Sequence, residues 1–228
     1  MRLNNNPNAQ NGAHGRIYNA IEKWYVENLA TDGTPFLGGK IDNAFKPVTG
    51  PGSTDHVWEK FNVGDFLASL LGSDFDCDDL NALFSLSCSG TNLLQRIFDQ
   101  LPSMDPKNMQ IGFAAMNGNL NGMKGWMFSQ GYSESRFNNI YNTNDKIIQG
   151  LERQAIIFNL FNFDSGIQSM HDQTNNRIYQ AFLELDKYIS TNKIQRANRR
   201  GDLIKQFGPA FKAWYGQLLL NTGSAAYG

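Results

Sequence analysis

Residues 109–127, MQIGFAAMNGNLNGMKGWM, carry the most regular apolar pattern of the chain. Apolar side chains recur there at alternating intervals of four and three residues, at Met109, Phe113, Met116, Leu120, Met123 and Met127. This heptad spacing predicts a helix of about five turns that packs along one face. Each of its glycines costs roughly 1 kcal/mol relative to alanine, which is easiest to explain if neighbouring backbones approach closely. We therefore predict a central, buried, Met/Gly-rich helix.

Helical periodicity continues on both sides of this segment. Further helices are predicted over residues 15–30, 54–71, 78–84, 92–101, 137–161, 173–190 and 202–220, with an irregular loop over 33–53 and a kink at 208–209. No segment alternates as a strand does, so we predict an all-α fold of about seven to nine helices. A chain of 228 residues is most simply one domain. We place that domain at 14–220, between a flexible leader, 1–13, and a flexible tail, 221–228.

Composition limits the classes of partner and compartment. The formal net charge is -1, which argues against nucleic acid or a charged membrane surface as partner. No apolar run reaches the length of a transmembrane helix, and the first residues lack the apolar region of a signal peptide. The low lysine content, the many Asn, Gly and aromatic residues and two nearby cysteines fit a secreted protein.

The stretch SDFDCDDLNALFSLSC, residues 73–88, invites a metal or acid–base interpretation. Asp74, Asp76 and Asp78 fit the first three ligand positions of an EF-hand loop. Asp79, however, stands where that loop needs glycine, and Ser85 stands where it needs a bidentate glutamate. The three histidines lie far apart, without zinc spacing. We predict no metal site.

Enzymatic alternatives use the same carboxylates. Residues 76–79 match the D-x-D-D acid motif of class II terpene cyclases, which are much longer proteins, and the related D-D-x-x-D metal motif fails at Ala82. His56 and Glu59 share one face of the helix predicted at 54–71 and could act as acid and base, or simply pair within the helix. The weak catalytic candidates are Asp76, Asp78, Asp79, His56 and Glu59. A P-loop and a G-x-S-x-G elbow are absent, and we predict no cofactor.

A structural interpretation of the same stretch is also open. Asp78 and Asp79 precede an apolar helical pattern, as negative side chains do in the first turn of a helix. Cys77 and Cys88 are eleven residues apart, and a disulfide between them would contribute roughly 2–3 kcal/mol by closing a short loop. Two reduced, buried thiols are the alternative.

Four blocks give the chain a family resemblance. They are TDHVWE at 54–59, LNGMKGWMF at 120–128, AIIFNLFN at 155–162 and AFKAWYG at 210–216. With them the chain resembles, from about residue 13 to 216, the helical C-terminal region of secreted fungal killer-toxin-like chitinases, which also accompanies heat-labile-enterotoxin-like proteins. The resemblance implies secretion, a helical fold and an oxidised Cys77–Cys88 pair. It implies no catalytic role, because the chitinase D-x-x-D-x-D-x-E motif, the alternating strands of a TIM barrel and a β-rich NAD pocket are absent.

The sequence therefore favours a secreted, non-catalytic helical module that binds a protein or a cell-wall or cell-surface glycan. One alternative is an enzyme that uses the acidic cluster at 74–79, either metal-dependent or terpene-cyclase-like. A second alternative is a membrane-active toxin domain, for which the seam at 109–127 would be the moving element.

Overall fold

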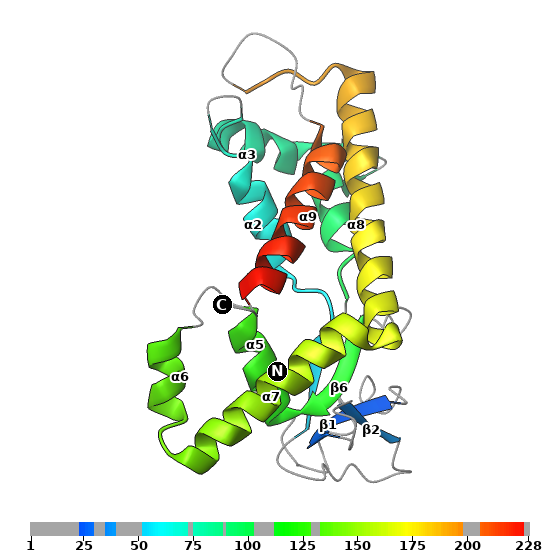
Figure 1. The fold of residues 1–228 in the computed structure, drawn as a ribbon. Coiled ribbons are helices and arrows are strands. Elements are labelled where there is room, and N and C mark those ends of the chain that lie inside the picture. Colours follow the sequence, from blue (N-terminus) through cyan, green and yellow to red (C-terminus); the bar gives the residue numbers. More distant parts are fainter. Residues whose placement is uncertain are drawn as a thin grey trace, which may run out of the picture. The chain divides into compact units, whose positions relative to one another are not determined.

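The computed structural model describes residues 23–29, 35–39, 52–72, 75–88, 90–102, 112–128, 133–197 and 206–225 (Figure 1). Over these residues the chain is mostly helical, and its eight helices fall within the predicted number, so the fold class is confirmed. Strands are present too, in one four-stranded sheet and one two-stranded sheet. The predicted leader, 1–13, lies outside the described residues.

The chain divides into two compact units, each described separately below. Unit 1 comprises Met1–Val57 and Ser103–His171, and unit 2 comprises Trp58–Pro102 and Asp172–Gly228. The buried apolar residues form two clusters, one in each unit. The predicted domain limits at residues 14 and 220 stay predictions.

Unit 1 contains the larger sheet. Its strands are β1, Lys23–Leu29, β2, Pro35–Gly39, β3, Gly52–His56, and β6, Phe113–Asn117, in the order β2-β1-β6-β3. Strand β1 pairs antiparallel with β2 and parallel with β6. Strand β3 pairs antiparallel with β6, in a register that places Asp55 opposite Ala114.

Three helix predictions are wrong at these strands. Residues 23–29 form β1 within the helix predicted at 15–30, residues 54–56 belong to β3, and residues 113–117 form β6 within the central Met/Gly helix. Strand β6 is paired on both sides, and Phe113, Ala114 and Met116 are all buried. A strand buried on both faces shows no alternation, so its apolar residues fit a helical period equally well. Met109 lies outside the described residues.

The second half of the predicted seam is a helix. Helix α5, Gly118–Met127, buries Leu120 and Met123, and it packs against α7 and the sheet. The predicted helix at 137–161 is two helices, α6, Glu134–Ile140, and α7, Asn144–Phe163. The break arises because the Thr143 hydroxyl accepts a hydrogen bond from Lys146 N and so caps a new helix. Helix α7 also contacts β1 and β2.

The described residues of unit 2 are helical apart from a short hairpin. Its helices are α2, Phe61–Ser69, α3, Cys77–Ser85, α4, Leu93–Phe98, α8, Ser165–Asn192, which begins in unit 1, and α9, Phe207–Ala225. The hairpin pairs β4, Ser87–Cys88, with β5, Thr91–Asn92. Its turn uses Gly90 at a φ of 78°, a left-handed conformation that favours glycine. Helices α2, α3 and α4 confirm the helices predicted over residues 54–71, 78–84 and 92–101.

Aromatic side chains fill the core of unit 2. Phe66 lies edge-on to Phe182 and Phe211, with ring centroids 5.0 and 5.2 Å apart. Gly208 and Pro209 were predicted to kink a helix, but they lie in the first turn of α9, where proline's missing N–H is harmless. The carboxylate of Asp186 caps that turn by accepting hydrogen bonds from the backbone N–H of Phe207 and of Gly208, at 2.7 and 2.8 Å. Helix α9 continues to Ala225, past the predicted end at 220.

Candidate functional site

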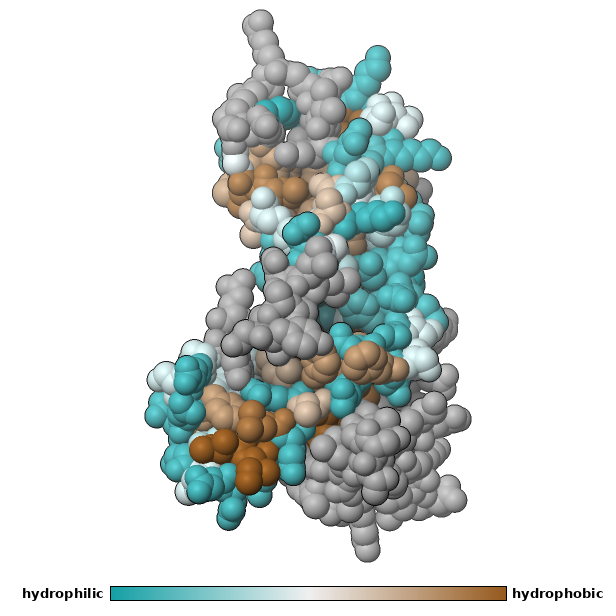
Figure 2. Space-filling model, viewed as in Figure 1, coloured by the Kyte–Doolittle hydropathy of each residue, from teal (hydrophilic) through white to brown (hydrophobic). Residues whose placement is uncertain are grey.

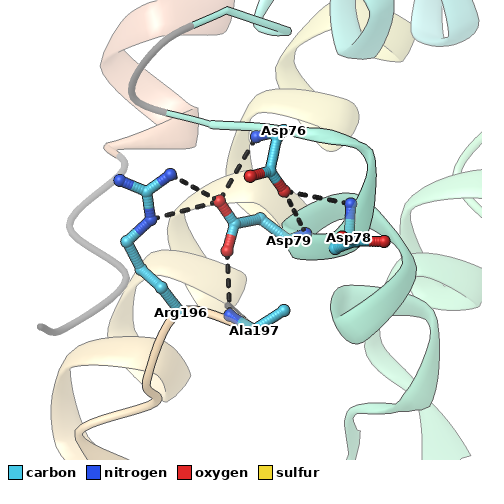
Figure 3. Close-up of polar contacts among 5 residues, drawn as sticks. All are labelled: Asp76, Asp78, Asp79, Arg196 and Ala197. Carbon is cyan, nitrogen blue, oxygen red and sulfur yellow. Dashed lines mark hydrogen bonds and ion pairs between the residues drawn. The ribbon is translucent and has the colours of Figure 1, made fainter. Parts of the chain in front are cut away.

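The acidic stretch begins a helix. Asp76 is the N-cap of α3, and its Oδ1 accepts hydrogen bonds from the backbone N–H of Asp78 and of Asp79, both at 3.0 Å (Figure 3). In return, Asp79 Oδ2 accepts a hydrogen bond from Asp76 N at 3.2 Å. This is a reciprocal capping box, with aspartate in the place where glutamate or glutamine is usual. The predicted acidic helix start is confirmed.

Asp79 also joins α3 to the segment that follows α8. Its Oδ2 lies 2.8 Å from Arg196 Nη2 and 3.1 Å from Arg196 Nε, and its Oδ1 accepts a hydrogen bond from Ala197 N at 3.0 Å (Figure 3). Asp79 is only 1% exposed. Burial alone would raise the pKa of this carboxyl, but the hydrogen bonds from Arg196, Ala197 and Asp76 outweigh it and hold the pKa below its ordinary value.

This arrangement limits the chemistry that the acidic cluster can perform. Asp79 already accepts hydrogen bonds at both carboxylate oxygens, and Asp76 Oδ1 holds the first turn of α3. Asp78 is exposed, and Asp74 lies outside the described residues. Within the part of the chain that the structure describes, no group of three or more His, Cys, Asp or Glu residues could hold a metal ion. The cluster is built as a helix cap joined to an ion pair.

The disulfide expected from the resemblance is absent from the structure. Cys77 and Cys88 are two thiols, the first exposed and the second half-buried. Cys77 is the first residue of helix α3, whose nine residues extend about 12 Å before the chain reaches Cys88, whereas bonded cysteines have Cα atoms roughly 4.4–6.8 Å apart. The residues after α3 turn into the β4–β5 hairpin, where the carbonyl of Cys88 accepts a hydrogen bond from Arg96 Nη2 at 2.9 Å. Neither thiol is fully buried, as the alternative prediction of two reduced, buried thiols required.

His56 and Glu59 do not share a helical face. His56 ends β3 in unit 1, whereas Glu59 precedes α2 in unit 2. The imidazole of His56 packs on the ring of Phe113, with ring centroids 4.6 Å apart. The backbone carbonyl of His56 accepts a hydrogen bond from Lys124 Nζ. The helical face predicted to hold both His56 and Glu59 is therefore wrong, because the helix begins only at Phe61.

A buried ion pair in unit 1 was not predicted. Lys124 Nζ, on α5, lies 2.6 Å from Asp55 Oδ2 on β3 and 2.6 Å from the carbonyl oxygen of His56. It also lies 5.5 Å from the centroid of the Phe161 ring. The Lys124 side chain is 1% exposed and that of Asp55 is 15% exposed. The sequence signal for this pair was Lys124, the one lysine among the regularly spaced apolar residues at 109–127.

The pair joins two of the sequence blocks that carry the family resemblance, TDHVWE and LNGMKGWMF. No protein-family model matches the chain, and no curated protein and no solved structure matches it either. Among the described residues, no helix is long and apolar enough to cross a membrane.

Proposed function

We propose that the chain is a secreted, non-catalytic helical module that binds a protein or a cell-wall or cell-surface glycan. The observation that carries this proposal is the engagement of the acidic cluster. Asp76 and Asp79, the carboxylates on which the enzymatic alternative depends most, are occupied in the helix cap and in the Arg196 ion pair. The hydrogen bonds to Asp79 hold the pKa of its carboxyl below the ordinary value, which makes it a poor general base.

One further feature supports a binding role. Large apolar side chains are exposed on α6 and α7, among them Ile140, Ile148 and Leu151, each about half exposed. Such side chains are common at surfaces that bind other proteins. Secretion enters the proposal through the low lysine content and the resemblance to secreted fungal toxin-like proteins; the two free thiols do not support it.

A double variant separates binding from catalysis. Asp76→Asn/Asp78→Asn removes two charges from the cluster while asparagine keeps the N-cap hydrogen bonds, so the helix is retained. The purified chain and the variant are incubated with chitin, β-glucan and extracted surface proteins, and bound chain and altered products are both measured. We expect saturable binding that is the same for both proteins, with equal melting temperatures. Conversion of any of these materials by the natural chain would contradict the proposal, and its loss in the variant would assign the catalysis to the acidic cluster.

A further inference from the structure

Helix α7 carries a second apolar face, turned away from the core of unit 1. We name as the α7 stripe the residues Ile148, Leu151, Ala155 and Phe158, which follow one another at intervals of three, four and three. Ile148 is 56% exposed and Leu151 is 53% exposed, while Ala155 is exposed and Phe158 half-buried. Figure 2 shows apolar residues gathered over the start of α7 beside α6, where Ile140 is 51% exposed.

The stripe is additional to the face that holds the helix in place. The core-facing side of α7 is formed by Ile156, Ile157, Leu160 and Gly150, all buried. A helix that packs on one side only needs polar residues on the other. The spacing of the stripe is that of an apolar seam between two helices. The shape that fits it is therefore another helix with an apolar face of its own.

Charge along one edge of the stripe selects the partner. Asp145 and Glu152 are exposed and lie three residues before and four residues after Ile148, so both are its neighbours on the helix surface. The cations of the same segment are directed elsewhere. Lys146 Nζ donates a hydrogen bond to Asn142 Oδ1 at 3.3 Å, and Arg153 Nη1 donates one to the Tyr141 hydroxyl at 3.4 Å. The edge beside Ile148 is acidic.

We propose that the α7 stripe binds an amphipathic helix of a partner protein, with Lys or Arg along the edge that meets Asp145 and Glu152. A second copy of α7 fits this edge less well, because it would bring no cation that is directed toward these carboxylates. Opposite charges beside an apolar seam set the choice of partner and its orientation. This inference rests on the proposed function, since it names the chemistry of the partner at one surface of the module.

Two synthetic peptides test the proposal. Each spans about three heptads with leucine at the a and d positions, and the residues beside them are lysine in one peptide and glutamate in the other. Fluorescence anisotropy measures the binding of each to the full chain. We expect the lysine peptide to bind about tenfold more tightly than the glutamate peptide at low salt, and the difference to shrink at high salt. We expect Leu151→Asp to weaken binding at least about tenfold, and Glu152→Lys to abolish the preference between the peptides, because the new lysine offsets the charge of Asp145.

Phe61→Asp is the matched control. Phe61 is a similarly exposed apolar residue, 48%, on α2 of unit 2, and its replacement should leave peptide binding unchanged. Melting temperatures establish that all variants fold. Equal binding of the two peptides, or an unchanged affinity in Leu151→Asp, would overturn the proposal.

One further variant, Ile148→Asp, distinguishes two other possible occupants of the α7 stripe. A concentration-dependent dimer, abolished by Ile148→Asp in sedimentation velocity, would show that the stripe binds a second copy. Binding to phosphatidylcholine vesicles, abolished by the same variant, would show that it binds a lipid surface. Either result overturns the proposal. If neither peptide binds, while Asp76→Asn/Asp78→Asn still binds chitin, β-glucan or surface proteins as the natural chain does, only the stripe inference is rejected. If the natural chain catalyses a conversion that the double variant has lost, the proposed function is rejected.

Discussion

Two buried ion pairs, one in each unit, differ in which of their charges is buried. In unit 2 the anion is enclosed: Asp79 is 2% exposed at its side chain, and Arg196 is 15% exposed. In unit 1 the cation is enclosed: Lys124 is 1% exposed, and Asp55 is 15% exposed. The buried carboxylate also accepts backbone hydrogen bonds from Asp76 and Ala197, which remain if the arginine is removed. The comparison indicates that the consequence of a mutation depends on which charge it leaves buried.

The largest effect is expected from Asp55→Ala. This change leaves the Lys124 ammonium buried without its carboxylate, and the free energy of unfolding should fall by about 3–5 kcal/mol. Urea denaturation measures it. Lys124→Met is the matched control: it removes the buried charge instead and leaves Asp55 partly exposed, so it should cost less than about 1.5 kcal/mol. Equal losses of unfolding free energy in Asp55→Ala and Lys124→Met would show that the cost does not depend on which charge is left buried.

A smaller effect is expected from Arg196→Met. Asp79 then loses the two guanidinium hydrogen bonds but keeps those from Asp76 N and Ala197 N. We expect the free energy of unfolding to fall by about 2 kcal/mol in urea denaturation, because hydrogen bonds to charged groups each contribute roughly 1.5–3 kcal/mol before relaxation. A loss as large as that of Asp55→Ala would show that the backbone donors do not protect the buried anion.

Asp76→Ala should have a still smaller effect. It removes the N-cap acceptor of α3 and should cost about 1 kcal/mol, whereas Asp76→Asn should be nearly neutral because asparagine caps helices as well as aspartate does. Thermal unfolding of the two variants measures the difference. If asparagine costs as much as alanine, then the charge of Asp76, and not its capping hydrogen bonds, stabilises the helix.

The smallest effect is expected from pH. The pKa of Asp79 in the folded chain lies below its ordinary value of 3.8, so the unfolded chain binds more protons in this range. The stabilisation by ionised Asp79 is therefore complete above pH 3.8 and is lost as the pH falls through the folded pKa. Urea denaturation of the natural chain and of Asp79→Asn should show a stability difference that narrows below pH 3.8. A stability difference that stays constant, or that widens, as the pH falls would contradict a lowered pKa of Asp79 in the folded chain.

The helix start at residues 76–79 could be predicted because its signals are local. Aspartates within the first turn of an apolar helical pattern are sufficient to identify it. Arg196 could not be identified as the partner, because it lies 117 residues from Asp79 along the chain. Asp55 and Lys124 likewise belong to segments that only the folded chain brings together.

Strand β6 shows where periodicity fails. Its residues Phe113, Ala114 and Met116 are buried between two neighbouring strands, so nothing in their order distinguishes strand from helix. The heptad spacing is correct only from Leu120 onward, within α5. In α7 the same spacing follows a face on which Ile148 and Leu151 are exposed. Spacing predicts that a helix has an apolar face, but does not say what covers that face.

The central claim is that Asp79 links helix α3 to the segment after α8 through its ion pair with Arg196. A double-mutant cycle of Asp79→Asn and Arg196→Met, measured as free energies of unfolding in urea, tests it most directly. The contacts between these two side chains predict a coupling energy of about 1–3 kcal/mol. Additive effects, within about 0.5 kcal/mol, would contradict the claim.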